Sequence, residues 1–149
     1  MKTKIIPPVD QPFIVTSPYG WRVLRGKKQF HDGIDYVSSV SRNAIAIADG
    51  KIIIDFDEYD PRLRWTDGRH SAGNYVCLET IIHGEKYFAR YIHLKNNIIA
   101  NGQHVKQGDI LGSWDDVGYS FGAHLHFDMY DASWNKIDPT NILLNGYNI

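Results

Sequence analysis

The chain has 149 residues, a length typical of one domain that buries about two-thirds of the surface its unfolded chain exposes. Lysine and arginine number 16 against 17 aspartate and glutamate residues, so a net charge of −1 excludes a basic footprint for nucleic acid or an anionic membrane. No segment is apolar for long enough to span a bilayer, and no signal peptide is visible. We therefore expect a domain with no nucleic-acid partner and no membrane segment, and we take it to be a monomer.

The first half of the chain predicts short strands separated by turns. Three prolines in the first dozen residues indicate an extended N-terminal arm over 1–12, and we place a single domain at 13–149. The elements expected next are a strand over 13–16, a turn over 19–22, a polar loop over 25–29, an extended run over 34–37 and a hairpin of 44–48 with 51–56. Residues 57–73 are charged and lack a hydrophobic period, which predicts a long surface loop.

The second half continues the same pattern. A hairpin is expected from 74–82 and 85–92 across His83-Gly84, with the lone Cys77 as a small buried side chain. Turns and short strands alternate through 101–112, and a strand carrying two histidines follows. Near the end, Asp138 is the expected N-cap of a short helix that begins at Pro139. Short strands with turn signals at almost every break predict an all-β fold.

Two histidines separated by one leucine, His124 and His126, lie in a run that predicts a β-strand. Side chains alternate along a strand, so both imidazoles share one face, roughly 7 Å apart, with Leu125 on the other. Burying two imidazoles requires partners for their nitrogens, and a divalent metal suits two neutral imidazoles. The alternative is an exposed strand face that carries two histidines.

A histidine and an aspartate, His31 and Asp35, are four residues apart with Gly33 between them. In a straight strand they would lie roughly 13 Å apart, too far to share an ion, so a bend at Gly33 is required if both are ligands. Alternatively, the segment is a surface turn with an incidental histidine. His93 stands at the end of a predicted strand, where its side chain can face a cleft.

Three segments of the chain together offer imidazoles and a carboxylate as metal ligands: His31 with Asp35, His93, and His124 with His126. Two imidazoles, one carboxylate and an open position make a catalytic zinc site, whereas structural zinc sites are closed and usually rich in cysteine. One cysteine in the chain excludes the common structural site. The residues alone do not decide which of the neighbouring histidines bind the metal.

The three motifs, in this order, resemble those of the LytM/lysostaphin-like zinc metallopeptidases, peptidase family M23. The resemblance rests on His31-x-x-x-Asp35, on Tyr91-Ile92-His93-Leu94 and on His124-Leu125-His126-Phe127. Flanking segments that are also similar to the family's are 17–22, 102–112 and 118–123, so the resemblance covers about residues 13 to 140. Departures from the family's pattern are Ala123 for a common proline, Asp128 for a common glutamate, and a longer 57–73 loop.

The resemblance implies that His31, Asp35 and His126 bind one zinc ion per chain and that His93 and His124 are catalytic. It also implies a largely antiparallel, split barrel-like sheet of the barrel-sandwich hybrid type, with a groove that holds the metal site. The implied substrate is bacterial peptidoglycan peptide, in stems or cross-bridges, hydrolysed by a zinc-activated water. Such a bacteriolytic enzyme acts on the cell wall, as a phage-encoded lysin or tail-associated enzyme or as a domain of an exported bacterial protein.

Two other functions compete with the zinc endopeptidase. Relatives that lack ligands serve as non-catalytic activators or scaffolds of other cell-wall hydrolases, although this chain keeps all five positions. The pattern Gly102-Gln103-x-Val105-x-x-Gly108-Asp109 also resembles biotinyl and lipoyl carrier domains, which have no use for His124 and His126. Residues 57–73 could rim the groove near His93 and read the substrate peptide, or they could be a solvated loop without a role.

Overall fold

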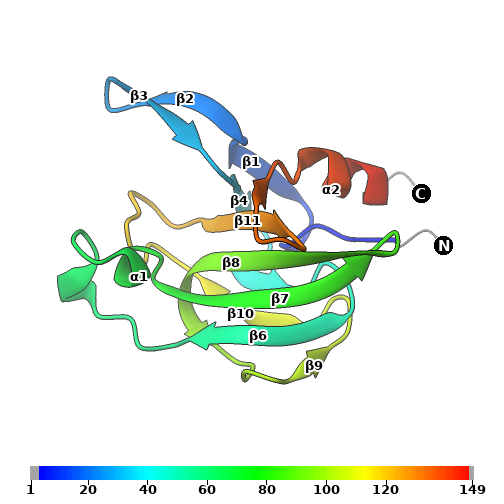
Figure 1. Ribbon diagram of the computed structural model, residues 1–149. Coiled ribbons are helices and arrows are strands. Elements are labelled where there is room, and N and C mark those ends of the chain that lie inside the picture. The colour runs from blue at the N-terminus through cyan, green and yellow to red at the C-terminus, as the bar shows by residue number, and fades with distance from the viewer. Residues whose placement is uncertain (1–3, 148–149) are drawn as a thin grey trace.

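The computed structural model of the chain describes residues 4–147 and is all-β with little helix (Figure 1). The strands are β1 (Phe13–Ser17), β2 (Gly20–Leu24), β3 (Lys27–His31), β4 (Ile34–Ser38), β5 (Asn43–Ile45), β6 (Gly50–Phe56), β7 (Asn74–Ile82), β8 (Glu85–Asn97), β9 (His104–Val105), β10 (Ile110–Trp114), β11 (Leu125–Asp131) and β12 (Lys136–Ile137). The helical elements are η1 (Pro61–Leu63), α1 (Gly68–Ser71) and α2 (Thr140–Tyr147). No helix among residues 4–147 has both the length and the apolar character needed to cross a membrane.

Ten strands form one sheet in the order β1-β4-β11-β8-β7-β6-β9, to which β10, β5 and β12 attach beside this path. Every pairing between described strands is antiparallel, as expected for short strands joined by turns. The long strand β8 pairs with β7 and β11 along most of its length and with β10 at its C-terminal end. The sheet therefore folds over itself without closing into a barrel, which agrees with the split architecture expected.

Strands β2 and β3 form a separate two-stranded hairpin that projects away from the main sheet (Figure 1). Its turn residues Arg25 and Gly26 both have positive φ, 53° and 76°, the conformation of the tight turns that match strand twist. The prediction of a polar loop over 25–29 is therefore wrong. Arg25, Lys27 and Lys28 stand together at and after its turn, which concealed the alternation of its second strand in the sequence.

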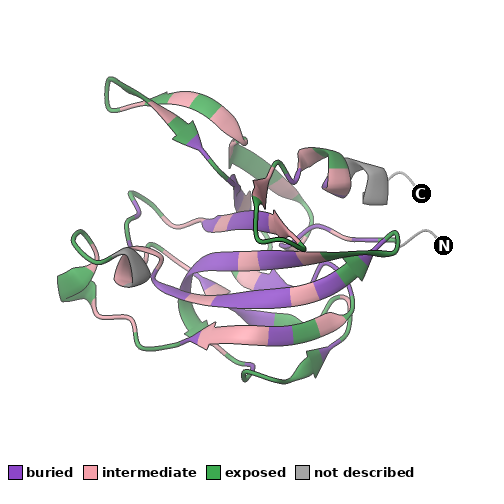
Figure 2. Ribbon diagram, viewed as in Figure 1, coloured by how far each residue is buried: buried purple, intermediate pink, exposed green. Residues whose placement is uncertain are grey.

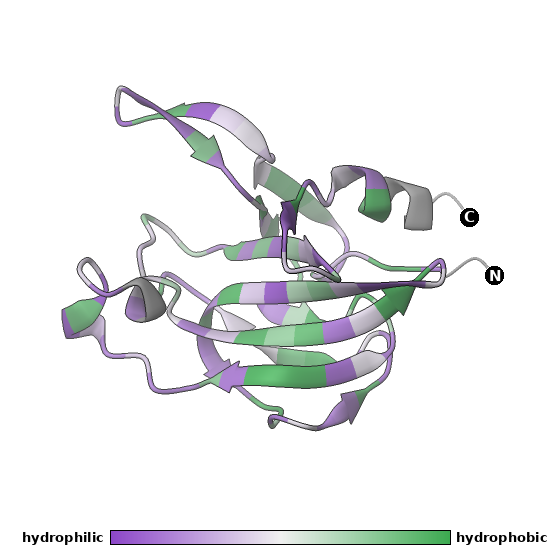
Figure 3. Cartoon of the chain, viewed as in Figure 1, coloured by the Kyte–Doolittle hydropathy of each residue, from purple (hydrophilic) through white to green (hydrophobic). Residues whose placement is uncertain are grey.

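The apolar core lies between the folded layers of the sheet. Buried residues follow β7, β8 and β11 in Figure 2, and hydrophobic residues are frequent on the same strands and on β6 in Figure 3. Tyr91 and Phe127 pack edge to face with their ring centroids 5.2 Å apart, and both are fully buried. Cys77 is buried as expected. This packing holds β8 and β11 side by side, where two of the three histidine motifs are carried.

The hairpin predicted from 74–82 and 85–92 is confirmed as β7 and β8, with His83 and Gly84 at φ 52° and 82° in its turn. The C-terminal helix is confirmed as α2, and the Asp138 carboxylate accepts a hydrogen bond of 2.9 Å from the backbone N–H of Thr140. The hairpin predicted from 44–48 and 51–56 is wrong, because β5 pairs with β10 whereas β6 pairs with β7 and β9. β5 and β6 are consecutive in the sequence, but each pairs with other strands in the folded sheet.

The segment 57–73 is a long surface excursion, but it contains two short helical turns, η1 and α1. Asp60 caps the first turn by accepting a 2.9 Å hydrogen bond from the Arg62 N–H. His70 accepts a 2.9 Å bond from the Asp60 N–H through Nδ1 and packs edge to face on Phe56. These local contacts give the segment a defined shape without a hydrophobic period.

Candidate metal centre

His31 and Asp35 flank a break in the chain between β3 and β4. His31 ends β3, whereas β4 begins at Ile34, so residues 32 and 33 form the bend that the spacing requires. Gly33 permits this bend because a Cβ there would lie 2.6 Å from His126 Nε2 and 2.7 Å from the Phe127 carbonyl oxygen. Any larger residue would press on the β11 backbone and on the imidazole of His126.

Asp35 and His126 lie directly opposite each other on neighbouring strands. The antiparallel register of β4 with β11 pairs Asp35 with His126, and the register of β11 with β8 pairs His126 with Ile92. Cβ atoms of directly opposed residues are about 4.5–5.5 Å apart, so both side chains reach the same space above the sheet. His31 enters that space from the end of β3.

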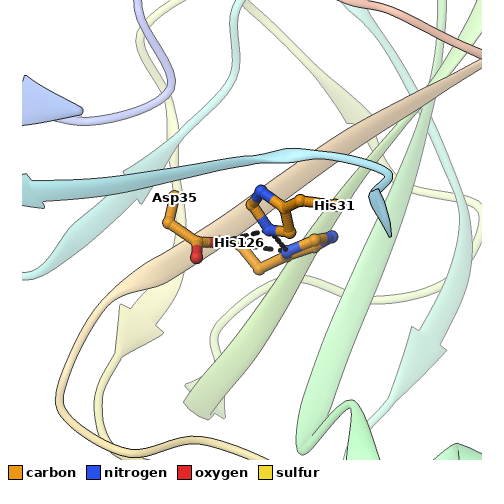
Figure 4. A group of neighbouring side chains, drawn as sticks. All are labelled: His31, Asp35 and His126. Carbon is orange, nitrogen blue, oxygen red and sulfur yellow. Dashed lines mark hydrogen bonds and ion pairs between the residues drawn. The ribbon is translucent and has the colours of Figure 1, made fainter. Parts of the chain in front are cut away.

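Three ligand atoms converge there, as Figure 4 shows. His31 Nε2 is 3.2 Å from His126 Nδ1 and 3.2 Å from Asp35 Oδ1, and His126 Nδ1 is 3.0 Å from Asp35 Oδ1. Zinc–ligand distances of about 2.0–2.1 Å at tetrahedral angles place two ligand atoms about 3.3 Å apart. The spacing of the three atoms therefore fits three corners of a zinc site.

In His31 and His126, the ring nitrogen that points away from the other ligand atoms donates to an oxygen that can only accept a hydrogen bond. His31 donates through Nδ1 to the Pro18 carbonyl oxygen, 2.9 Å away, and His126 donates through Nε2 to the Asp128 carboxylate, 3.1 Å away. When both imidazoles are neutral, these hydrogen bonds fix tautomers that direct two nitrogen lone pairs at one point. Two lone pairs and a carboxylate oxygen at about 3 Å repel one another unless a cation lies between them, which is the donor set that zinc prefers.

The charges around the centre stabilise positive charge at that point. Burial disfavours the charged form of His126, but Asp128 and Asp35 outweigh it and raise the pKa of His126 to about 9. Burial also acts against ionised Asp35, yet hydrogen bonds from His126 and His31 hold the pKa of Asp35 well below its usual range. Before a metal binds, a proton supplies this positive charge, and zinc would compete with it.

His93 reaches the same centre from an irregular point of β8. The register of β7 with β8 shifts between Tyr91 and Leu94, and His93 has a positive φ of 68°. Bulges and such backbone conformations redirect side chains and are concentrated at functional sites. Burial, together with nearby His124 and His126, lowers the pKa of His93 to about 3, so this buried imidazole is neutral at physiological pH.

His124 precedes β11 and lies beside His93, with the two ring centroids 4.8 Å apart. Its Nδ1 donates a 2.8 Å hydrogen bond to the Gly122 carbonyl oxygen. Its Nε2 is consequently free to accept a proton, and it lies 3.6 Å from Asp35 Oδ1. The five residues expected at the site are thus brought together, with His93 and His124 side by side next to the three converging ligand atoms.

The five residues line one groove with a volume of about 880 Å³. One wall comes from β1 and the β2–β3 hairpin, and the other from the segment before β11 and from Ser71 and Ala72. Tyr119 and Phe121 on the second wall pack on Trp65 of the 57–73 segment, at centroid distances of 4.8 and 5.7 Å. The segment therefore supports the groove wall through Trp65, whereas its His70 faces Asp60 and Phe56.

Sequence reasoning missed the residues that surround the ligands. Arg22 Nη1 donates to Ser17 Oγ at 2.9 Å and lies 3.6 Å from the second oxygen of Asp35. In the sequence, Asp128 stands out only as a departure from a family pattern, although it bonds to His126. Its place two residues after His126 on the same strand face was the one signal available, because its other partners, Arg90 and Lys136, come from other strands.

Comparison with known proteins agrees with this architecture. The model of peptidase family M23 matches residues 29–139. The chain is 27% identical to the peptidoglycan DD-endopeptidase ShyA of Vibrio cholerae, covering 82% of this chain but 26% of that protein. It spans less than a third of the length of the first curated relatives it matches.

Solved structures show the same fold. The catalytic domain of the antimicrobial peptidase lysostaphin from Staphylococcus simulans superposes with a TM-score of 0.61 at 27% identity, covering 88% of this chain and 90% of that one. A zinc-containing peptidase from Vibrio cholerae superposes with a TM-score of 0.65 at 28% identity, covering 88% of this chain and 37% of that one. The lysostaphin-type fold thus accounts for nearly the whole chain.

Proposed function

This chain belongs to peptidase family M23, and we propose that it is a zinc metalloendopeptidase that hydrolyses peptide bonds in bacterial peptidoglycan. The observation that carries the proposal is the convergence of His31 Nε2, Asp35 Oδ1 and His126 Nδ1 within 3.2 Å of one another. We assign these three residues as the ligands of one zinc ion. When bound, zinc supplies a Lewis acid for the scissile carbonyl and lowers the pKa of water to about 7.

His93 and His124 are the groups that we assign to proton transfer. His124 offers a free Nε2 because its Nδ1 is engaged by the Gly122 carbonyl oxygen, so it can take a proton from the attacking water. His93 is buried and neutral at its side, where it can hydrogen-bond the developing oxyanion. His124 can then pass the proton that it took from the water to the leaving amine. Each such task typically contributes a hundredfold or more to the rate.

The groove suits an extended peptide that crosses the centre. Its lining includes all five residues and mixes apolar side chains such as Phe30 and Tyr119 with arginines such as Arg22 and Arg90. A peptide with both apolar and acidic groups, as in peptidoglycan stems, matches this lining. The relative named as a peptidoglycan DD-endopeptidase and the zinc-containing structural neighbour support the same substrate and metal for this chain.

Digestion of purified cell walls tests the proposal. The zinc-loaded chain is incubated with walls that carry direct cross-links and with walls that carry glycine bridges, and mass spectrometry identifies released fragments and their new amino termini. We expect cleaved peptide from at least one wall type, and none after chelation or from His124→Ala. A zinc-loaded chain that releases nothing from either wall would contradict the enzyme and favour a non-catalytic scaffold.

A further inference from the structure

A second cluster of charges lies behind the metal centre and is built around Asp128. This carboxylate is fully buried in β11, with 0% of its surface exposed. It follows His126 by two residues, so both side chains leave the strand on the same face. Asp128 therefore sits directly against the side of the His126 ring that points away from His31 and Asp35.

Both oxygens of Asp128 are taken up by hydrogen bonds. Arg90 of β8 donates to Oδ1 through Nε at 2.8 Å and to Oδ2 through Nη2 at 2.7 Å. Lys136 of β12 and His126 Nε2 each donate to Oδ2 at 3.1 Å. Oδ2, the oxygen that faces His126, thus accepts three of these four hydrogen bonds and has no lone pair left for a metal ion. Its geometry is that of an acceptor for His126 and not that of a fourth ligand.

Lys136 also binds Asp32, a second carboxylate that lies near His126 Nε2. Asp32 Oδ1 lies 3.7 Å from His126 Nε2, and Asp32 belongs to the bend next to His31. The Lys136 ammonium bonds to Asp32 Oδ2 at 3.1 Å and thereby ties this bend to Asp128. Two carboxylates are balanced by two cations, Arg90 and Lys136, so the cluster as a whole is neutral around the imidazole.

The hydrogen bond to Asp128 determines which nitrogen of the neutral His126 ring carries the proton. Asp128 accepts from Nε2, so the neutral ring is held as the tautomer with a lone pair on Nδ1, and Nδ1 is the atom that meets His31 Nε2 and Asp35 Oδ1. In the other tautomer the lone pair would face Asp128, and Nδ1–H would face the metal position. Outer hydrogen bonds of this kind orient metal ligands and strengthen their basicity.

We propose that Asp128 is a positioning residue of the metal centre: held by Arg90 and Lys136, it fixes the ring orientation of His126 and the tautomer that the ring adopts once it is neutral and can bind a metal. The inference rests on the proposed assignment of His126 as a ligand. It extends that assignment by naming the group that prepares the ligand. A merely structural role, in which Asp128 only joins β8 to β11 through Arg90, is the competing explanation.

The test compares Asp128→Asn with Arg90→Lys. The amide of Asp128→Asn keeps the shape of the side chain but loses its charge and one acceptor position, so Arg90, Lys136 and His126 compete for one oxygen. Arg90→Lys keeps a cation on Asp128 but loses the two-point contact to β8, so it weakens the strand connection and leaves the acceptor for His126 in place. Long-range ¹H–¹⁵N NMR of the metal-free proteins, recorded at a pH at which the ¹⁵N shifts show a neutral ring, reports the His126 tautomer, and chelator competition reports zinc affinity.

For Asp128→Asn we expect a mixture of His126 tautomers and a zinc affinity lower by about 10- to 100-fold. For Arg90→Lys we expect a lower melting temperature, an unchanged tautomer and a zinc affinity within about threefold of wild type. A wild-type tautomer and zinc affinity in Asp128→Asn would overturn the proposal, as would equal losses of zinc affinity in both variants. The tautomer is read without metal or substrate, so this result stands apart from any failure of the chain to cleave cell walls.

Discussion

Replacing Gly33 by alanine tests whether the bend between β3 and β4 builds the metal centre. The new Cβ would lie 2.6 Å from His126 Nε2 and 2.7 Å from the Phe127 carbonyl oxygen, against an ordinary contact of 3.4 Å or more. The Phe127 oxygen belongs to the backbone of the central strand β11, so most of the displacement falls on the His126 ring. That ring must move by about 0.8 Å, the difference between 3.4 and 2.6 Å.

Such a shift affects both stability and metal binding. Overpacking of this kind typically costs about 1–3 kcal/mol, which lowers the melting temperature of a domain of this size by roughly 2–12 °C. Metal–ligand distances tolerate only about ±0.2 Å, so we expect zinc affinity to fall at least tenfold, equivalent to about 1.4 kcal/mol.

The assay combines thermal unfolding of the metal-free protein with zinc titration against a chelator. Gly50→Ala is the matched control, because the new Cβ on β6 would press on the Glu79 carbonyl oxygen of β7, outside the metal centre. We expect Gly50→Ala to lose stability while it keeps wild-type zinc affinity. Wild-type zinc affinity in Gly33→Ala, or an equal loss in Gly50→Ala, would refute the role given to the bend.

Three further predictions follow from the site and the core. His93→Gln and His124→Gln should keep stoichiometric zinc but lose at least about a hundredfold in kcat, because neither is assigned as a ligand; loss of zinc from either, measured by elemental analysis, would contradict that assignment. Trp65→Ala should leave zinc content unchanged and lower kcat/KM on cell wall about tenfold, since Trp65 supports Tyr119 and Phe121 in the groove wall; unchanged kinetics would remove the 57–73 segment from substrate binding. Cys77, whose pKa burial raises to about 12, should not react with thiol reagents at pH 8 until the protein unfolds, and rapid labelling of the native chain would show that its core is more open than described.

The sequence predicted those parts of the fold that depend on neighbouring residues. The β7–β8 hairpin was predicted because His83-Gly84 favours a tight turn between two alternating runs, and α2 was predicted from Asp138 and Pro139. The β2–β3 hairpin was missed, since Arg25 adopts positive φ without being glycine, asparagine or aspartate. Pairing of β5 with β10 could not be foreseen, because it joins residues more than 60 positions apart through the folding of the sheet.

The candidate site, too, was predicted only in part from the sequence. Motif spacing and the resemblance to family M23 brought His31, Asp35, His93, His124 and His126 to one place, and the bend needed at Gly33 is present. The surrounding network was not foreseen, because Arg90 and Lys136 come from two strands, β8 and β12, that reach Asp128 only in the folded sheet. Local spacing identifies ligands on their own strands, whereas the groups that orient them depend on the register between strands.

The zinc content of the purified chain and of three single variants tests the central claim most directly. Wild type, His31→Ala, Asp35→Ala and His126→Ala are dialysed against the same zinc buffer and analysed by inductively coupled plasma mass spectrometry, with circular dichroism to confirm that each variant is folded. The account predicts one zinc per wild-type chain and less than about one-tenth of that in each folded variant, because each substitution removes one of three protein ligands. Stoichiometric zinc in all three folded variants, or none in wild type, would contradict it.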